Sequence, residues 1–222
     1  MVNNYSTQRE NMHIADGYLS PQTAITSFVI VVPLWIYGFK KLKSKLNEKT
    51  IPILGALSAL SFIIMMFNIP IPGGTSGHAV GATLIAILIN PWIAFISVSL
   101  VLLIQAVVFG DGGISTLAVN SFAMGFVAAF SGYYIFNLLK KYKFAPFVAG
   151  YISLVLASSM VAIVLGIQPI FWTHNGHPLY FPFDLKVTIP MMVGGHLLFG
   201  IAEGIFTQLI YTLLKKDKKE II

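Results

Sequence analysis

The apolar residues of this chain are gathered into long blocks that charged residues seldom interrupt, and this pattern limits the fold more than any other feature. Hydrophobic residues make up 56% of the 222 positions and charged residues 10%, whereas about a quarter of the residues in a soluble domain are charged. A soluble protein of this size cannot bury so much apolar surface, because its surface-to-volume ratio is too high. The composition therefore argues against a soluble enzyme, a disordered chain or a coiled coil, and it predicts a membrane protein.

A membrane-spanning helix needs about 20 apolar residues, and seven blocks of the sequence suggest such helices. They are Ser20–Phe39, Ile51–Asn68, Gly77–Ile89, Trp92–Phe109, Ser115–Leu139, Ala145–Ile167 and Val187–Leu214. The third block is short, but the turn-forming pair Asn90-Pro91 separates it from the fourth. We therefore predict an all-α integral membrane protein with about seven transmembrane helices. Six spans, with the third block re-entrant or merged, is the alternative.

Three lysine clusters predict the orientation of the chain in the membrane. Residues 40–49, 140–143 and 215–219 contain 12 of the 14 basic residues, and with seven spans all three clusters fall on one side. Basic loops favour the cytoplasm, so we expect the N-terminus outside and the C-terminus in the cytoplasm. Six spans would separate the clusters, which favours seven. The basic charge is thus explained by the lipid bilayer, and no nucleic-acid partner is expected.

Several absences narrow the chemistry that the sequence can support. The chain has no cysteine, so a transition metal would be held by nitrogen or oxygen ligands. It contains neither a G-x-x-x-x-G-K-[ST] phosphate loop nor an H-E-x-x-H motif, so neither P-loop ATP hydrolysis nor intramembrane metalloenzyme chemistry is expected. Residues 1–11 are polar and lack the apolar core of a signal peptide. We interpret them as an N-terminal extension ahead of a single membrane-embedded domain over residues 12–222.

Four polar segments, predicted to face outside, contain four of the five histidines. They cover residues 12–21, 72–81, 109–113 and 172–180. Histidine is the commonest metal ligand, so a metal site is one hypothesis for these segments and solvated histidines are the other. His174 and His177 form an H-x-x-H pattern in the fourth segment, and for this pair we favour a solvated or structural role.

The polar residues inside the predicted spans that need a partner are Gln105, Asn120, His196 and Glu203. Ionisable groups at membrane depth are costly and face a cavity or a partner. His196 and Glu203 are seven residues apart and so share one helix face. They predict either a structural hydrogen-bond network or a self-contained proton-coupled carrier of divalent metals. Gly200 and Gly204 predict a close helix contact, within the chain rather than with a partner subunit.

The segments MHIADGYLSP, PGGTSGHAVG, FGDGGI and GHPLYFPF occur in this order in the sequence. They resemble the NikM/CbiM family, the membrane-embedded substrate-binding (S) components of energy-coupling-factor transporters for nickel and cobalt. The resemblance covers residues 12–216, and the form of the first segment is closer to the nickel branch. It implies a transport subunit of a prokaryotic plasma membrane and not an enzyme. The partners that it implies are a transmembrane coupling subunit, two ATP-binding subunits and a small accessory membrane subunit.

In that family the mature chain begins with Met-His, and the resemblance implies that Met12, His13 and His78 bind the metal here. The Met12 amine, the backbone nitrogen and imidazole of His13 and the imidazole of His78 would supply four nitrogens. Such a set suits Ni(II), with Co(II) as the alternative substrate. Supporting roles around these ligands are expected for Asp16, Thr75, Ser76, Gln105, Asn120, His196 and Glu203.

Two acidic residues and the start of the chain leave alternatives open. Asp16 either orients His13 or caps the loop, or it caps the first helix. Asp111 is a turn former or a member of the polar network, the first being the safer interpretation. The free amine requires that Met12 begin the mature chain. We favour translation that starts at Met12. Removal of residues 1–11, and metal binding in another way or not at all, are the alternatives.

Overall fold

Long helices build most of the structure, which is a computed structural model that describes residues 13–71 and 75–221. The helices are α1 (Pro21–Lys45), α2 (Thr50–Met65), α3 (Ala82–Leu88), α4 (Pro91–Ile104), α5 (Leu117–Asn120), α6 (Ala128–Leu139), α7 (Ala145–Gly166), α8 (Gln168–Phe171) and α9 (Leu185–Ile221), with the π-helical turns η1 (Gln105–Phe109) and η2 (Ser121–Val127). Two short antiparallel hairpins pair β1 (Ile69–Ile71) with β2 (Thr75–Gly77) and β3 (Thr173–His174) with β4 (His177–Pro178).

Five helical segments of the described chain are long and apolar enough to cross a membrane. They are Pro21–Lys45, Pro91–Phe109, Leu117–Leu139, Ala145–Phe171 and Leu185–Lys215, and α2 is a shorter apolar helix of 16 residues. The prediction of an all-α integral membrane protein is therefore confirmed. The predicted break before the fourth block is also found, because the Asn90 side chain accepts a hydrogen bond from the Trp92 backbone N–H at the start of α4.

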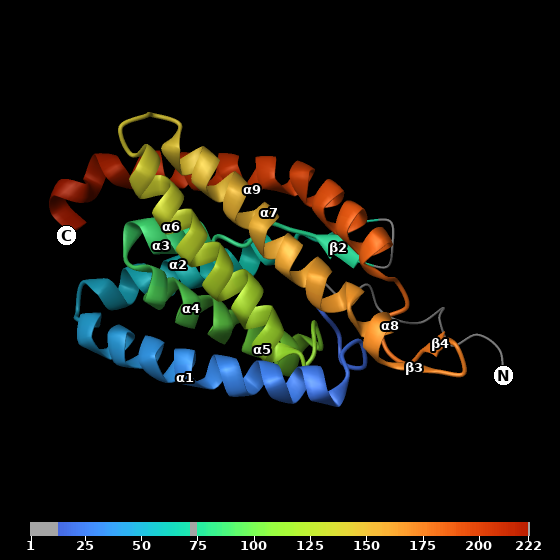
Figure 1. The fold of residues 1–222 in the computed structure, drawn as a ribbon. Coiled ribbons are helices and arrows are strands. Elements are labelled where there is room, and N and C mark those ends of the chain that lie inside the picture. The colour runs from blue at the N-terminus through green and yellow to red at the C-terminus, as the bar shows by residue number, and fades with distance from the viewer. Residues whose placement is uncertain (1–12, 72–74, 222) are drawn as a thin grey trace.

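The third predicted helix is where the structure differs. A helix was expected over Gly77–Ile89, but the chain stays extended from β2 to Gly81 and only α3 is helical. Gly81 precedes α3 with φ +77°, a left-handed conformation that glycine adopts readily. Figure 1 shows β2 and α3 toward opposite ends of the bundle, so this block runs along the bundle partly as extended chain. The structure thus has five long helices, α2 and this mixed segment in place of seven helical spans.

The mixed segment lies inside the protein. Residues 76–87 are all buried, in accord with the rule that non-helical backbone at membrane depth is tolerated only where protein surrounds it. The backbone groups of its extended part therefore need partners from other elements, because no strand continues beside them after β2.

The helix ends place the basic clusters together. In Figure 1 the α1–α2 connection, the α6–α7 connection and the C-terminus lie at the left end, whereas the start of α1, α8 and the β3–β4 hairpin lie at the right. The lysine-rich residues 40–49 and 140–143 belong to the first two of these regions, and residues 215–219 to the C-terminal part of α9. The fold therefore agrees with the expectation that the clusters share one side. The assignment of that side to the cytoplasm stays a prediction.

Helices α7 and α9 pack closely through glycines. A Cβ added to Gly200 would lie 2.9 Å from the Tyr151 ring, and one added to Gly204 would lie 2.8 Å from the Phe147 ring. Both aromatic residues belong to α7, so the two glycines of α9 serve packing within the chain, the use that the sequence favoured.

Candidate metal site

His13 and His78 meet at one end of the bundle although 64 residues separate them. Their ring centroids are 5.0 Å apart, the rings are inclined by 76°, and both side chains are buried. Among the described residues, neither ring nitrogen of His13 has a hydrogen-bond partner. The Nδ1 atom of His78 lies 3.0 Å from the Ala79 carbonyl oxygen, so a proton on Nδ1 would leave the lone pair on Nε2. Two buried imidazoles in contact are a suitable start for a transition-metal site.

The segment around Asp111 packs against His13. The Asp111 Oδ2 atom lies 3.5 Å from His13 Nδ1, and a Cβ added to Gly112, which has φ +79°, would lie 3.0 Å from the Cβ of His13. Asp111 is therefore a neighbour of the histidine pair and more than a turn former. Its carboxylate places negative charge where a cation would be favoured.

Asn120 holds the backbone that follows His13. Its side-chain oxygen accepts a hydrogen bond from Ile14 N at 3.2 Å, and its amide nitrogen donates to Ile14 O at 3.1 Å. The Thr116 hydroxyl also donates to Ile14 O at 2.5 Å. Asn120 therefore lies beside the residue that follows His13, and its supporting role in metal binding stays a prediction. Thr116 was not singled out from the sequence, where a threonine beside an apolar block carries no particular signal.

Asp16 ties the same segment to the turn before α5. Its Oδ1 accepts hydrogen bonds from the backbone N–H and the hydroxyl of Ser115 at 2.9 and 2.5 Å, and its Oδ2 accepts one from Ile114 N at 3.2 Å. Burial raises the pKa of Asp16, but these hydrogen bonds outweigh it and hold the pKa below its usual value. Ser20, and not Asp16, caps α1 by accepting from Thr23 N. Asp16 makes no direct hydrogen bond to His13, and a part for it in orienting that histidine through the loop stays a prediction.

Glu203 of α9 supplies partners for the extended segment that carries His78. Its carboxylate accepts hydrogen bonds from Val80 N at 2.7 Å and from Gly81 N at 3.0 and 3.1 Å. From α2, the Ser61 hydroxyl donates to Val80 O at 2.6 Å. Glu203 is fully buried, so these bonds satisfy both the carboxylate and the backbone that no strand or helix pairs.

His196 and Glu203 do not act as a pair in this structure. The Nδ1 atom of His196 lies 2.7 Å from Met192 O, one helical turn earlier, and its ring is 5.9 Å from that of Phe199. Across the described chain, no hydrogen bond or ion pair joins His196 to Glu203. The structural network is therefore the better account of both residues.

The remaining expected site residues are the supporting residues Gln105, Ser76 and Thr75 and the expected ligand Met12. Gln105 is buried at the start of η1, its amide atoms have no hydrogen bond among the described residues, and its backbone oxygen accepts from Asp111 N at 3.0 Å. Ser76 is buried in β2, close to His78 in sequence. Met12 and the side chain of Thr75 lie outside the described residues. Within those residues, no group of three or more His, Asp or Glu side chains could hold a metal ion.

Gln168 is a further anchor that the sequence did not indicate. Its Oε1 accepts a hydrogen bond from Ser20 N at 2.9 Å and its Nε2 donates to Val164 O at 2.9 Å. The side chain is fully buried. A glutamine at the end of an apolar block, just before Pro169, was the available signal.

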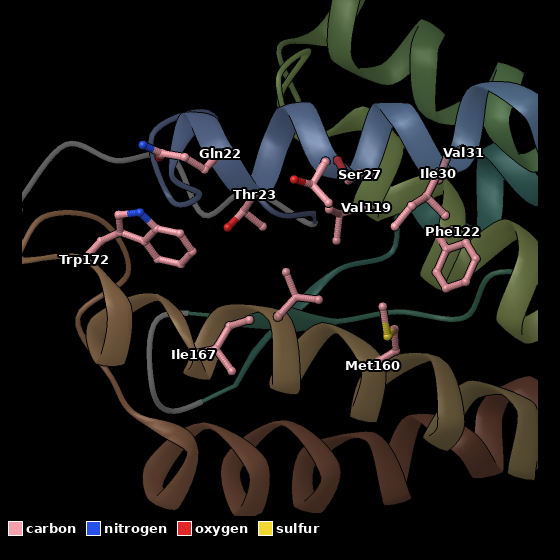
Figure 2. A pocket seen from close by; sticks show the side chains of 12 residues that line it. Gln22, Thr23, Ser27, Ile30, Val31, Val119, Phe122, Met160, Ile167 and Trp172 are labelled. Carbon is pink, nitrogen blue, oxygen red and sulfur yellow. The ribbon is translucent and has the colours of Figure 1, made fainter.

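A separate cavity lies between α1 and α7. It has a volume of about 360 Å³ and is lined by side chains that include Thr23, Ser27, Val119, Met160 and Trp172 (Figure 2). Neither histidine of the pair lines it. Its lining offers hydroxyl and amide groups but no imidazole or carboxylate, so it is unsuited to a transition-metal ion.

The fold and the histidine pair define a class of protein, namely a multi-pass helical membrane protein with a buried pair of potential metal ligands at one end. The chain belongs to the CbiM family, described as the cobalt uptake substrate-specific transmembrane region, whose sequence profile matches residues 13–221. It is therefore a multi-pass protein of the prokaryotic plasma membrane and a component of metal transport.

Relatives and solved structures agree with this family. A probable fused nickel transport protein, LarMN, of Lactiplantibacillus plantarum is 42% identical over 92% of this chain and 65% of its own length. A putative metal transport protein of Methanocaldococcus jannaschii is 41% identical over 95% of this chain and 94% of its own length. The crystal structure of a transition metal transporter matches with a TM-score of 0.90 and 46% identity, over 94% of this chain and 95% of that one.

The fused relatives are longer than this chain. The fused nickel transport protein NikMN of Rhodobacter capsulatus is 38% identical over 95% of this chain but only 64% of its own length. The chain thus spans about two thirds of the fused nickel relatives.

Proposed function

We propose that this chain is the substrate-binding membrane subunit of an energy-coupling-factor transporter, and that it binds Ni(II), with Co(II) as the alternative substrate. The observation that carries the proposal is the contact of the two buried rings of His13 and His78, with centroids 5.0 Å apart. Imidazole is a good ligand for both metals. The relatives named as nickel transport proteins, and a cobalt transport protein of Moorella thermoacetica at 29% identity, support this choice of substrates.

The proposed ligands are the Met12 amine, the backbone nitrogen and imidazole of His13, and the imidazole of His78. Four nitrogens suit the tetragonal coordination of Ni(II). Cu(II) would bind such a set more tightly, so selectivity would depend on access and on metal availability. Asp111 adds a negative charge beside His13, and the hydrogen bonds of Asn120 to Ile14 hold the backbone that follows it.

The direction of transport follows from the predicted topology. The histidine pair would face outside, at the end opposite the lysine clusters, and the metal would be released toward the cytoplasm. Two ATP-binding subunits would hydrolyse ATP, and a transmembrane coupling subunit, with a small accessory membrane subunit, would transmit the resulting motion. The geometry does not favour the self-contained proton-coupled carrier, because His196 and Glu203 each bind backbone atoms and not each other.

Native mass spectrometry of the tag-free chain, loaded with one equivalent of nickel, tests this proposal. A chain that begins at Met12, and that carries His174→Ala and His177→Ala so that no exposed histidine competes, is expected to hold one nickel ion. Addition of His78→Ala is expected to leave none, because one of four ligands is lost. The same chain with residues 1–11 attached should also hold none, since Met12 then has an amide in place of an amine.

His196→Gln is the matched control, since it changes a buried histidine outside the pair and should keep the nickel. Thermal unfolding in detergent shows whether each variant is folded. Unchanged nickel binding in both the His78→Ala chain and the extended chain would refute the proposed ligands.

A further inference from the structure

The β3–β4 hairpin places two histidines opposite each other. In its register His174 pairs with His177, and the two residues between them, Asn175 and Gly176, have φ values of 51° and 78°. Positive φ at both central residues is typical of a type I′ turn, for which Asn-Gly is the preferred sequence. The hairpin is therefore a locally determined structure and not an irregular loop.

The ladder continues beyond the two histidines. Leu179 N donates a hydrogen bond to Trp172 O at 3.1 Å, and Trp172 N donates to Gln168 O of α8 at 2.9 Å. The base of the hairpin is thus joined to the helical bundle, which restricts the position of the histidine pair.

This arrangement brings two imidazoles within reach of one metal ion. Residues directly opposite on antiparallel strands point to the same face, with Cβ atoms about 4.5–5.5 Å apart. Both histidines are exposed, so an ion can arrive with its hydration shell, exchange two waters for two imidazole nitrogens and keep the others. Imidazole with water is a ligand set that suits Ni(II), Cu(II) and Zn(II).

We propose that His174 and His177 form a second, exposed binding site for a divalent transition-metal ion. The site is separate from the buried pair of His13 and His78, and it holds its ion more weakly, because two protein ligands replace a full set. It is on the same end of the bundle as the start of α1 (Figure 1). The proposal does not depend on the transport function, since it concerns binding by the hairpin alone.

The test is a nickel titration by isothermal calorimetry on the tag-free full chain, in a background that carries His13→Ala and His78→Ala. This background removes the buried pair, so the titration reports the hairpin only. One nickel ion per chain is expected to bind. Adding His174→Ala and His177→Ala should weaken binding at least about tenfold, because both imidazole ligands are lost, and with them the gain from holding two ligands together.

A second variant tests the pairing itself. Asn175→Pro keeps both imidazoles but cannot adopt φ 51° at this position, so it breaks the turn and should weaken binding nearly as much as loss of the histidines. Thr173→Ala, an exposed change in β3, is the control and should leave the affinity unchanged. The thermal midpoint of each variant confirms that the bundle is folded.

Three results would overturn the proposal. They are no nickel binding up to about 1 mM in the background variant, equal affinity after both hairpin histidines are removed, and full affinity in Asn175→Pro. These results are distinguishable from failure of the proposed function, which would appear as equal nickel binding with and without His78→Ala in a chain that lacks both hairpin histidines.

Discussion

At the scale of single residues, Glu203 shows how a carboxylate is accommodated at membrane depth without a basic partner. An ionisable group there is costly, and each backbone N–H left without an acceptor is also costly. Three hydrogen bonds to Val80 N and Gly81 N satisfy both needs together. Because Val80 and Gly81 lie two and three residues after His78, Glu203 is expected to hold the position of that histidine.

Glu203→Gln is expected to weaken both the fold and nickel binding. The glutamine keeps one acceptor oxygen but directs an amide N–H toward backbone donors, which should cost about 1–3 kcal/mol for a buried group left unsatisfied. The loss is measured by the thermal midpoint in detergent, and the effect on His78 by nickel titration.

His196→Gln provides the comparison, because glutamine can still donate to Met192 O. It is expected to change nickel affinity little. Loss of metal binding in His196→Gln together with normal behaviour of Glu203→Gln would contradict the positioning role and support a direct role of His196.

At the scale of elements, the segment before α1 is attached to the turn before α5 by side chains instead of by a strand ladder. Asp16 bonds to Ser115 and Ile114, while Asn120 bonds to Ile14, 106 positions away in sequence. This attachment brings His13 beside Asp111 and orders one half of the proposed site.

The attachment of this segment should depend on pH through Asp16. The pKa of Asp16 is lower in the folded protein than the ordinary value of an aspartate side chain. Its stabilising contribution is therefore complete above about pH 4 and is lost as the pH falls through the folded pKa. The difference in thermal midpoint between the unaltered chain and Asp16→Asn should be constant from about pH 5 to 7 and shrink below about pH 4.

Gly113→Ala affects the same contact without a titrating group. An added Cβ would collide with Asp16, so the variant should be less stable at every pH. Gly194→Ala, where nothing lies within 4 Å of an added Cβ, is the control.

The thermal midpoints of Asp16→Asn and the unaltered chain give the outcome that would contradict this prediction. If their difference stays constant down to about pH 3, the hydrogen bonds of Asp16 do not depend on its charged carboxylate.

At the scale of the whole molecule, the fold separates two ends of different character. Three lysine-rich regions lie at one end, and the start of α1, β2 and the β3–β4 hairpin lie toward the other (Figure 1). Positive charge favours the cytoplasmic side, so the predicted orientation places the histidines outside.

Single cysteines can test this orientation cleanly, because the chain has none of its own. Asn47→Cys and Lys141→Cys are expected to react with a membrane-impermeant maleimide only after cells are permeabilised. Gly55→Cys, inside α2, serves as the lipid-depth control and should react poorly in both cases. Asn175→Cys should react in intact cells, and the reverse pattern would show that the orientation is inverted.

The sequence by itself determined the class of fold and most of the helices. Three local features of the sequence predicted this much: apolar blocks long enough to cross a bilayer, the Asn90-Pro91 break and the lysine clusters. Each depends only on residues that are neighbours in the sequence. The glycine-rich segment before α3 was the exception. There Glu203 and Ser61 bond the buried extended backbone, and these partners lie far away in the sequence.

Only the tertiary structure decided which polar residues meet. Three contacts join distant parts of the chain: His13 with His78, Asp111 with His13, and Ile14 with Asn120. The first was expected from the family resemblance alone, and no local pattern of the residues predicts any of the three. A sequence pattern predicts whether a residue is buried and which secondary structure it adopts. The partner that satisfies a buried polar group is set by the packing of several helices together, because a buried group binds whichever donor or acceptor the whole fold brings to it.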